Sequence, residues 1–162
     1  IYAASWRGER KPWTIISGSD EGGIYKSADA GKTWQKLKKG LPKGLIGKID
    51  LATTAADPNR VYALIEAENG KGGVYTSYDR GKNFSAMSHR KELVNRPFYY
   101  CNLEADPKNA DIIFSNANRF MMSNDAGKTW KIMRTPHGDN HDIWINPNNT
   151  NIWIQSLSLI HI

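Results

Sequence analysis

Short runs of β-branched and aromatic residues alternate along this chain with polar turns rich in Gly, Pro, Asn and Asp. One stretch shows the order in full, with strand-like runs at 47–52, 60–65, 73–76 and 84–87. Runs of this length and composition, bounded by turn residues, are typical of β-strands. The pattern therefore predicts a unit of four consecutive strands.

The four-strand unit returns along the chain, so we expect an all-β protein. A later unit has its runs at 98–103, 111–114, 120–122 and 130–133. Another begins with runs at 141–145 and 151–154. In the earliest unit, 13–17, 23–26 and 34–37 are strand-like, and 1–6 is the candidate for its first strand. An Asp-Pro or Asn-Pro turn joins the first and second strands of the later units.

A polar segment, here named the turn octapeptide, separates the last two strands of each full unit. It reads Ser-x-Asp-x-Gly-Lys-(Thr/Asn)-(Trp/Phe), and its copies recur at intervals of about 50 residues, which is typical of propellers, solenoids and arrays. The positions that the copies share are Ser27, Asp29, Gly31 and Trp34; Ser77, Asp79, Gly81 and Phe84; and Ser123, Asp125, Gly127 and Trp130.

The residue types of the turn octapeptide predict a structural role. Ser and Asp side chains can accept hydrogen bonds from backbone N–H groups just ahead of them. The glycine supplies a backbone position with positive φ, and the aromatic residue that follows is expected to bury a large apolar surface. A calcium loop is the alternative, but the spacing lacks the alternating acidic ligands and the distal Glu of such loops.

The three copies resemble the Asp-box of BNR-repeat β-propellers, and the chain as a whole is similar to bacterial sortilin-like BNR-repeat proteins, which often carry a glycosyl hydrolase label. This resemblance implies a partial β-propeller of four-stranded antiparallel blades, about three blades plus half of a fourth. The expected blades span about 1–40, 45–88, 97–134 and 140–156. The remaining blades of the same chain are then expected partners of this segment.

Composition and charge narrow the class of protein further. The net charge is +6, but Lys and Arg are scattered, so nucleic-acid binding is not expected. The tightest basic cluster, Lys36, Lys38, Lys39 and Lys43, is interpreted as a solvated strand end and loop. No apolar run is long enough to span a membrane, and the single Cys101 excludes an internal disulfide.

Both ends of the sequence are unusual. The chain starts with Ile1 and shows no signal peptide, and 157–162 resembles the translation of a sequencing adapter rather than a strand bounded by turns. We therefore expect a fragment whose domain occupies 1–156, followed by a non-native tail at 157–162. For the complete protein we expect a secreted or cell-envelope location.

Candidate ligand-binding residues fall in the irregular links opposite the turn octapeptides, since variable loops on a rigid scaffold usually carry function. The first link ends in Arg96, Pro97, Phe98, Tyr99 and Tyr100. Arg96 is a candidate partner for a carboxylate, and Tyr99 or Tyr100 can offer a stacking face. Neighbouring side chains on a strand point to opposite sides, so one of the two tyrosines is alternatively a core residue.

The second link is the densest polar cluster in the sequence, with His137, Asp139, His141 and Asp142. In an extended segment His137, Asp139 and His141 share a side, which makes a metal site one interpretation. A polar ligand site and a purely structural cluster are the others. We predict that these four residues belong to a ligand-binding site, and we expect neither a metal nor a cofactor there.

The sequence thus predicts a non-catalytic recognition module of a larger sortilin-like propeller that binds a peptide or glycan at the channel mouth. The alternative is a glycoside hydrolase with part of its active site in missing blades. The sialidase arginine motif is not reproduced, because Arg96-Pro97 lacks the intervening Ile. Whether the chain is an enzyme stays open here, since no catalytic residue can be assigned.

Overall fold

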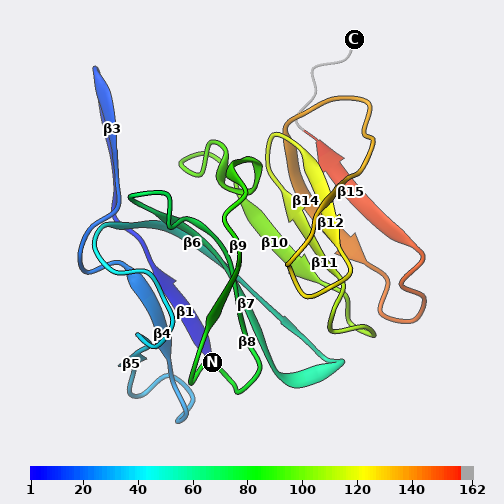
Figure 1. Cartoon of the computed structure of the whole chain (residues 1–162), viewed down its shortest axis with the longest axis horizontal. Helices are drawn as coiled ribbons and strands as arrows, with labels where there is room; N and C mark the ends of the chain where they lie inside the picture. The colour runs from blue at the N-terminus through cyan, green and yellow to red at the C-terminus, as the bar shows by residue number, and fades with distance from the viewer. Residues whose placement is uncertain (158–162) are drawn as a thin grey trace.

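The computed structural model describes residues 1–157, which form five antiparallel sheets; four stand side by side across the molecule, and the fifth is a two-stranded hairpin (Figure 1). The second sheet consists of β6 (Ile46–Thr54), β7 (Asp57–Ala67), β8 (Gly73–Ser77) and β9 (Ser85–Ser88). The third consists of β10 (Asn102–Ala105), β11 (Ile113–Asn116), β12 (Phe120–Ser123) and β13 (Lys131–Ile132). In both sheets the strands pair in sequence order, as the four-strand pattern predicted.

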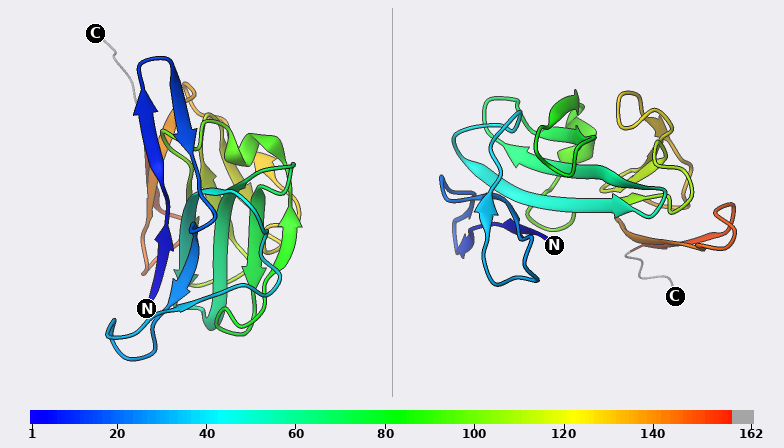
Figure 2. Two further views of the ribbon diagram at one scale, coloured as in Figure 1. Left: turned by 90° about the vertical axis from the view of Figure 1, so that its left-hand side faces the viewer. Right: turned by 90° about the horizontal axis from the view of Figure 1, so that it is seen from below.

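The first sheet differs from the predicted order of strands. Its strands are β1 (Tyr2–Ser5), β4 (Gly23–Lys26) and β5 (Gln35–Lys36), and β1 pairs directly with β4. The segment 1–6 therefore takes the place of a second strand, not of a first. The run at 13–17 is displaced from the sheet, because β3 (Thr14–Ser17) pairs with β2 (Gly8–Lys11) in a separate hairpin. Figure 2 shows this hairpin projecting beyond the sheet that carries β1 and β4.

The fourth sheet contains β14 (Asn140–Ile145) and β15 (Trp153–Leu157), joined by the Asn146-Pro147 turn. Leu157, the first residue of the predicted tail, is the last residue of β15 and pairs with Asn140. The rest of that predicted tail, 158–162, lies outside the described residues. No helix of the described chain is long and apolar enough to cross a membrane.

The hydrophobic core lies between successive sheets, not within a single layer. Alternate residues of β7 point to opposite sides, so that Val61, Ala63 and Ile65 pack toward the first sheet, while Tyr62 and Leu64 pack toward the third. Sheets that are apolar on both faces are expected in a propeller, where each blade is covered by its neighbours. The first strands of the later sheets adjoin one another, β6 beside β10 and β10 beside β14. We call β6, β10 and β14 the inner strands.

The turn octapeptides have the hydrogen bonds that their residue types predicted. In the second copy the hydroxyl of Ser77 accepts from Gly81 N at 2.8 Å, and Asp79 accepts from Asn83 N at 2.9 Å. Gly81 has a φ of 78°, the positive value predicted for the glycine, and Arg80 before it also has a positive φ, of 61°. Equivalent bonds occur in the first and third copies.

The aromatic residue that ends the turn octapeptide is buried only where a sheet covers it. Phe84 is 4% exposed and packs toward the first sheet, and Trp130 packs toward the second. Trp34 is 44% exposed, against the expectation of burial. The reason is that no sheet of the described residues lies on the corresponding side of the first sheet.

Three inter-sheet links connect the last strand of one sheet to the inner strand of the next. They span 37–45, 89–101 and 133–139, and the second contains the short helix η1 (Lys91–Val94). Because strand direction alternates, these links lie at the opposite edge of the sheets from the turn octapeptides. The β2–β3 hairpin connects β1 to β4 and therefore lies on the same side as the links.

Candidate functional site

Two residues of the predicted site have backbone conformations that side chains rarely adopt. Arg96 has a φ of 61° and Asp139 a φ of 63°. The carbonyl of Arg96 accepts from Tyr99 N at 3.1 Å and from Tyr100 N at 3.3 Å, which closes a turn. This turn delays the inner strand, so β10 begins at Asn102 and not at 98 as the apolar run predicted. The left-handed conformation is less uncommon for Asp than for Arg.

The second and third inter-sheet links meet at these two residues. The hydroxyl of Tyr100 donates a hydrogen bond to Asp139 Oδ1, and Arg96 Nη1 lies 3.7 Å from the same oxygen. The ring of Tyr100 stacks on that of His141, with centroids 4.5 Å apart and an angle of 26°. We call these four residues the carboxylate cluster. The structure thus brings together four of the seven residues that the sequence singled out.

The environment of Tyr100 keeps its hydroxyl protonated. Burial raises the pKa of Tyr100, and the hydrogen bond to the negatively charged Asp139 raises it further. At neutral pH the phenol is therefore a hydrogen-bond donor that holds the Asp139 carboxylate in place. Arg96 remains accessible, with 58% of its side chain exposed.

Tyr99 belongs to a second group, which we call the aromatic platform. Arg10, at the β2 side of the hairpin, donates from Nη2 to the hydroxyl of Tyr99 at 2.7 Å. The same guanidinium lies 5.6 Å from the centroid of the Tyr99 ring and 5.8 Å from that of Phe98. Trp6 meets Phe98 edge to face at 5.7 Å. The platform is open to solvent, since Tyr99 is 58% exposed.

The two tyrosines settle the alternatives that the sequence left open for them. Tyr100 is 7% exposed and points inward, whereas its neighbour Tyr99 points outward. Sequence reasoning missed Trp6 and Arg10, because they lie about 90 positions from the residues that they touch. The only local signal was a pair of arginines, Arg7 and Arg10, between the tryptophans Trp6 and Trp13.

The remaining candidates lie at other positions. Asp142 is exposed on β14, and its Oδ1 accepts from Ile143 N at 2.9 Å. His137 lines a surface hollow with Asn118 and Arg134. Among residues 1–157 no three His, Cys, Asp or Glu side chains gather as metal ligands would, so the metal interpretation of His137, Asp139 and His141 finds no support in the geometry.

A row of acidic residues along the inner strands was also missed. Burial raises the pKa of Asp50 on β6, and burial together with the nearby charges of Asp50 and Asp142 raises the pKa of Glu104 on β10. Carboxyl groups with a raised pKa are features of both ligand sites and structural ion networks. The available signal was the presence of acidic residues in strands whose neighbours are apolar.

The acidic residues that could have formed a glycosidase pair are each engaged separately. Glu66 accepts from the hydroxyl of Ser17 at 2.6 Å, and Glu68 accepts from Leu45 N at 3.1 Å. Asp139 is held by Tyr100, as described above, and Asp142 by its own neighbour. A glycoside hydrolase needs two carboxyl groups facing each other across the sugar. These four residues show no such pairing.

Comparisons with known proteins give a family and a fold. Residues 22–146, more than half of the chain, match the Sortilin-Vps10 family, described as sortilin, neurotensin receptor 3. No curated protein matches the sequence.

Several solved structures share the fold. One is a GH74 enzyme of Niastella koreensis, with a TM-score of 0.56, 21% identity, and coverage of 83% of this chain and 22% of that one. Another is an ancestral GH74 enzyme, with a TM-score of 0.54, 14% identity, and coverage of 87% of this chain and 20% of that one. A third is YCF48 bound to D1 peptide, with a TM-score of 0.51, 14% identity, and coverage of 80% of this chain and 36% of that one. The chain thus spans between about a fifth and a third of the length of these proteins, and at such identities the likeness shows the fold alone.

Proposed function

The chain belongs to the Sortilin-Vps10 family, and from this premise we propose that it is a non-catalytic recognition module of a larger propeller. The proposed ligand is a peptide or a glycan. It binds on the side of the inter-sheet links, across the aromatic platform and the carboxylate cluster. The turn octapeptides, on the opposite edge, serve as scaffold.

One observation carries this proposal: the fold brings Arg10, from a segment about 90 residues away, onto the exposed ring of Tyr99. Arg10 reaches it from the β2–β3 hairpin, and Arg96 precedes it in the same link. Exposed aromatic rings stack on sugars and on peptide side chains, and a guanidinium offers a fixed fork of donors to carboxylates. A surface of this composition suits an extended polar polymer with acidic or ring-shaped groups.

The relatives in structure are compatible with either ligand. YCF48 is described as bound to a peptide, and the GH74 proteins are described as enzymes of a glycoside hydrolase family. Neither description transfers to this chain by itself. The choice between peptide and glycan is therefore left to the binding experiment.

The proposal is tested by measuring binding to arrays of peptides and of oligosaccharides with the purified chain and its variants. We expect Tyr99→Ala and Arg96→Gly to weaken binding of the best array ligand at least tenfold. Arg96→Gly should not lower the melting temperature, because glycine adopts the left-handed conformation without strain and the exposed ion pair to Asp139 contributes little.

Lys82→Ala is the matched control, since Lys82 is an exposed cationic residue of a turn octapeptide on the other edge. Its binding should equal that of the unmodified chain. If Arg96→Gly unfolds the chain or leaves binding unchanged, Arg96 is a structural residue and the proposed site is wrong.

The second candidate function is glycoside hydrolysis, and the row of inner-strand acids is the observation that favours it. A carboxyl group with a raised pKa, such as that of Glu104, suits a general acid. Hydrolysis of β-glucan oligosaccharides, followed by release of reducing ends, tests this reading. Activity that Glu104→Gln lowers at least a hundredfold would establish the hydrolase and displace the recognition module.

We also propose that further sheets of the same protein cover the outer face of the fourth sheet. Trp144 and Ile154 pair across β14 and β15 and are 54% and 68% exposed. Asp50 on β6 accepts from Leu103 N of the next inner strand, and Asn102 on β10 donates to the carbonyl of His141 on the one after. Asp142 has the equivalent position on β14 and would bond to a following strand. A longer product of the gene should show reduced exposure of Trp144 by fluorescence quenching.

For the complete protein we propose a secreted or cell-envelope location, as expected for a receptor-like module. Cell fractionation with an antibody to this segment tests the location. Detection in the cytoplasm alone would contradict it.

A further inference from the structure

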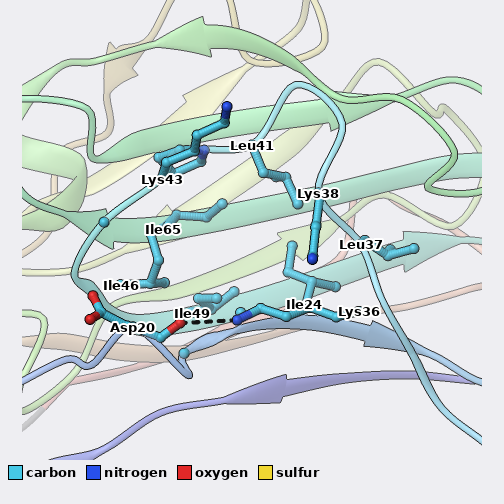
Figure 3. A pocket seen from close by; sticks show the side chains of 14 residues that line it. Asp20, Ile24, Lys36, Leu37, Lys38, Leu41, Lys43, Ile46, Ile49 and Ile65 are labelled. Carbon is cyan, nitrogen blue, oxygen red and sulfur yellow. Dashed lines mark hydrogen bonds between the residues drawn. The ribbon is translucent and has the colours of Figure 1, made fainter.

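A cavity of about 320 Å³ lies between the first and second sheets, below the first inter-sheet link (Figure 3). Its lining is apolar on the inside, with Ile24 of β4, Ile46 and Ile49 of β6, Ile65 of β7, and Leu41 of the link. Each of the four isoleucines is buried. The volume is roughly ten times the ~30 Å³ that one water molecule occupies in the liquid. The cavity therefore has room for a chain of several carbon atoms.

The equivalent place between the second and third sheets is filled by the protein itself. Val74 precedes its turn octapeptide by three residues, as Ile24 does, and it belongs to the same buried cluster as Leu93 of η1, which adjoins β8. Leu93 is completely buried, and its carbonyl accepts from the thiol of Cys101. The second link thus inserts an aliphatic side chain between the sheets. In the first link Leu41 is only partly buried and leaves the space below it open.

The rim of the cavity is cationic. Lys36, Lys38 and Lys43 line it, against the single carboxylate of Asp20, which lies at the far end from Lys38 in Figure 3. Lys36 already donates to the carbonyls of Asp20 and Glu21, at 3.2 Å each. Lys38 is exposed and has no such partner among the described residues, and Figure 3 shows its ammonium group on the side of Ile24 at the edge of the cavity. Lys38, Lys39 and Lys43 are exposed, as predicted for a solvated strand end and loop, and Lys38 and Lys43 also border an apolar space.

We propose that this cavity binds a medium-chain aliphatic carboxylate, of about six to ten carbon atoms. The carbon chain takes the place that Leu93 takes between the next two sheets, and the carboxylate pairs with Lys38. Burial of the chain supplies the affinity, at about 0.8 kcal/mol for each CH₂ removed from water. The ammonium group supplies the preference for an anion. This site is separate from the aromatic platform and the carboxylate cluster, and it does not rest on the function proposed for them.

Octanoate is the probe that tests the site. Titration into the chain, followed by calorimetry and by NMR of isoleucine δ1 methyl groups, should show saturable one-to-one binding that shifts the signals of Ile24, Ile46, Ile49 and Ile65. Octanol and octylammonium have the same carbon chain without the negative charge. We expect both to bind at least tenfold more weakly than octanoate.

Three variants locate the carboxylate and the chain. Lys38→Met keeps the length of the side chain and should weaken octanoate binding at least tenfold. Lys39→Met, next to it but outside the cavity lining, should change binding less than twofold. Leu41→Phe fills the cavity and should abolish binding while the methyl signals of the third sheet stay unchanged, which shows that the chain is folded.

Several outcomes would overturn the proposal. Equal binding of octanol and octanoate, or equal effects of Lys38→Met and Lys39→Met, would remove the carboxylate site. If the Leu41→Phe variant binds octanoate as tightly as the unmodified chain, the ligand binds at another site. A different outcome is that a leucine-terminated peptide shifts the same four methyl signals and binds with a tenfold higher affinity than octanoate. That result would assign the cavity to a peptide partner. None of these results would bear on binding at Tyr99 and Arg96.

Discussion

The carboxylates of the turn octapeptides are held in their charged form by short, local hydrogen bonds. In the first copy the hydroxyl of Thr33 donates to Asp29 Oδ2 at 2.6 Å and its N–H donates to Oδ1 at 2.9 Å. These bonds, the side-chain one first, lower the pKa of Asp29 to about 2. Asn83 has the same effect on Asp79, whose pKa is also about 2. All of these partners lie within four residues in the sequence.

Because these carboxylates have lowered pKa values, we expect the fold to lose stability at acidic pH. Their folded-state pKa lies below the unfolded value of about 4, so their contribution to stability is present above pH 4 and is lost as the pH falls toward 2. Urea unfolding midpoints measured between pH 6 and pH 2 should fall through this window. Asp79→Asn should lower the midpoint at pH 6 and match the unmodified chain near pH 2. A parallel decline of both proteins across the window would contradict the assignment.

Single residues were predictable when their partners are near in sequence and not otherwise. The bonds of Ser77 and Asp79 follow from residue type alone. Tyr99 and Tyr100 do point to opposite sides, but they lie in the turn closed by Arg96 and not on a strand, so strand alternation is not the cause. The contact between Arg10 and Tyr99 does not, because no local property of either residue encodes the position of the other. The left-handed conformation of Arg96 is likewise imposed by the turn around it.

At the scale of elements, the inter-sheet links decide what fills the space between sheets. The first link is held against the second sheet by the bond from Phe84 N to the carbonyl of Lys39, at 3.0 Å. Gly40 follows with a φ of 74°, and a Cβ atom there would collide with the backbone of Phe84. The path of the link over the cavity thus depends on a glycine at this position.

Gly40→Ala is therefore expected to be strongly destabilising. The left-handed conformation and the collision together should cost about 2–5 kcal/mol in the free energy of unfolding. Gly70 is the matched control, because it has a similar φ of 71° but nothing within 4 Å of its Cβ position. Gly70→Ala should cost only about 1–2 kcal/mol, for the conformation alone. Equal costs in chemical denaturation would show that the collision with Phe84 is relieved elsewhere.

The elements themselves were predicted well in the second and third sheets and less well in the first. There, β1 pairs with β4, and the run at 13–17 extends a hairpin instead of completing a sheet. Strand character follows from composition, but pairing depends on which strand is present to receive the hydrogen bonds. The same limit applies to Trp34, whose burial depends on a neighbouring sheet.

At the scale of the whole molecule, hydrogen bonds between inner strands fix the sheets relative to one another. Asp50 Oδ2 accepts from Leu103 N at 2.6 Å across the boundary of the second and third sheets. Burial raises the pKa of Asp50 despite this bond, so the negative charge is unfavourable there while the acceptor is needed. The two effects can be separated by substitution.

Asp50→Asn keeps an acceptor and removes the charge, whereas Asp50→Ala leaves Leu103 N–H without its partner. We expect Asp50→Ala to lower the free energy of unfolding by about 1–3 kcal/mol. Asp50→Asn should be at least as stable as the unmodified chain at pH 7. Since a raised folded-state pKa means that stability is gained on protonation, this advantage should shrink as the pH falls through that pKa. An Asn variant as unstable as the Ala variant would show that the charge itself is required.

The sequence by itself determined the strand content, the repeat and the chemistry of the turn octapeptides, because these depend on residues within one unit. It also identified the two links where Arg96, Tyr100, Asp139 and His141 meet. Only the tertiary structure decided that the β2–β3 hairpin completes the aromatic platform and that Leu93 fills one boundary between sheets while the cavity remains at another. These features depend on distances between units that are far apart in the chain, and such distances are set by the packing of sheet against sheet.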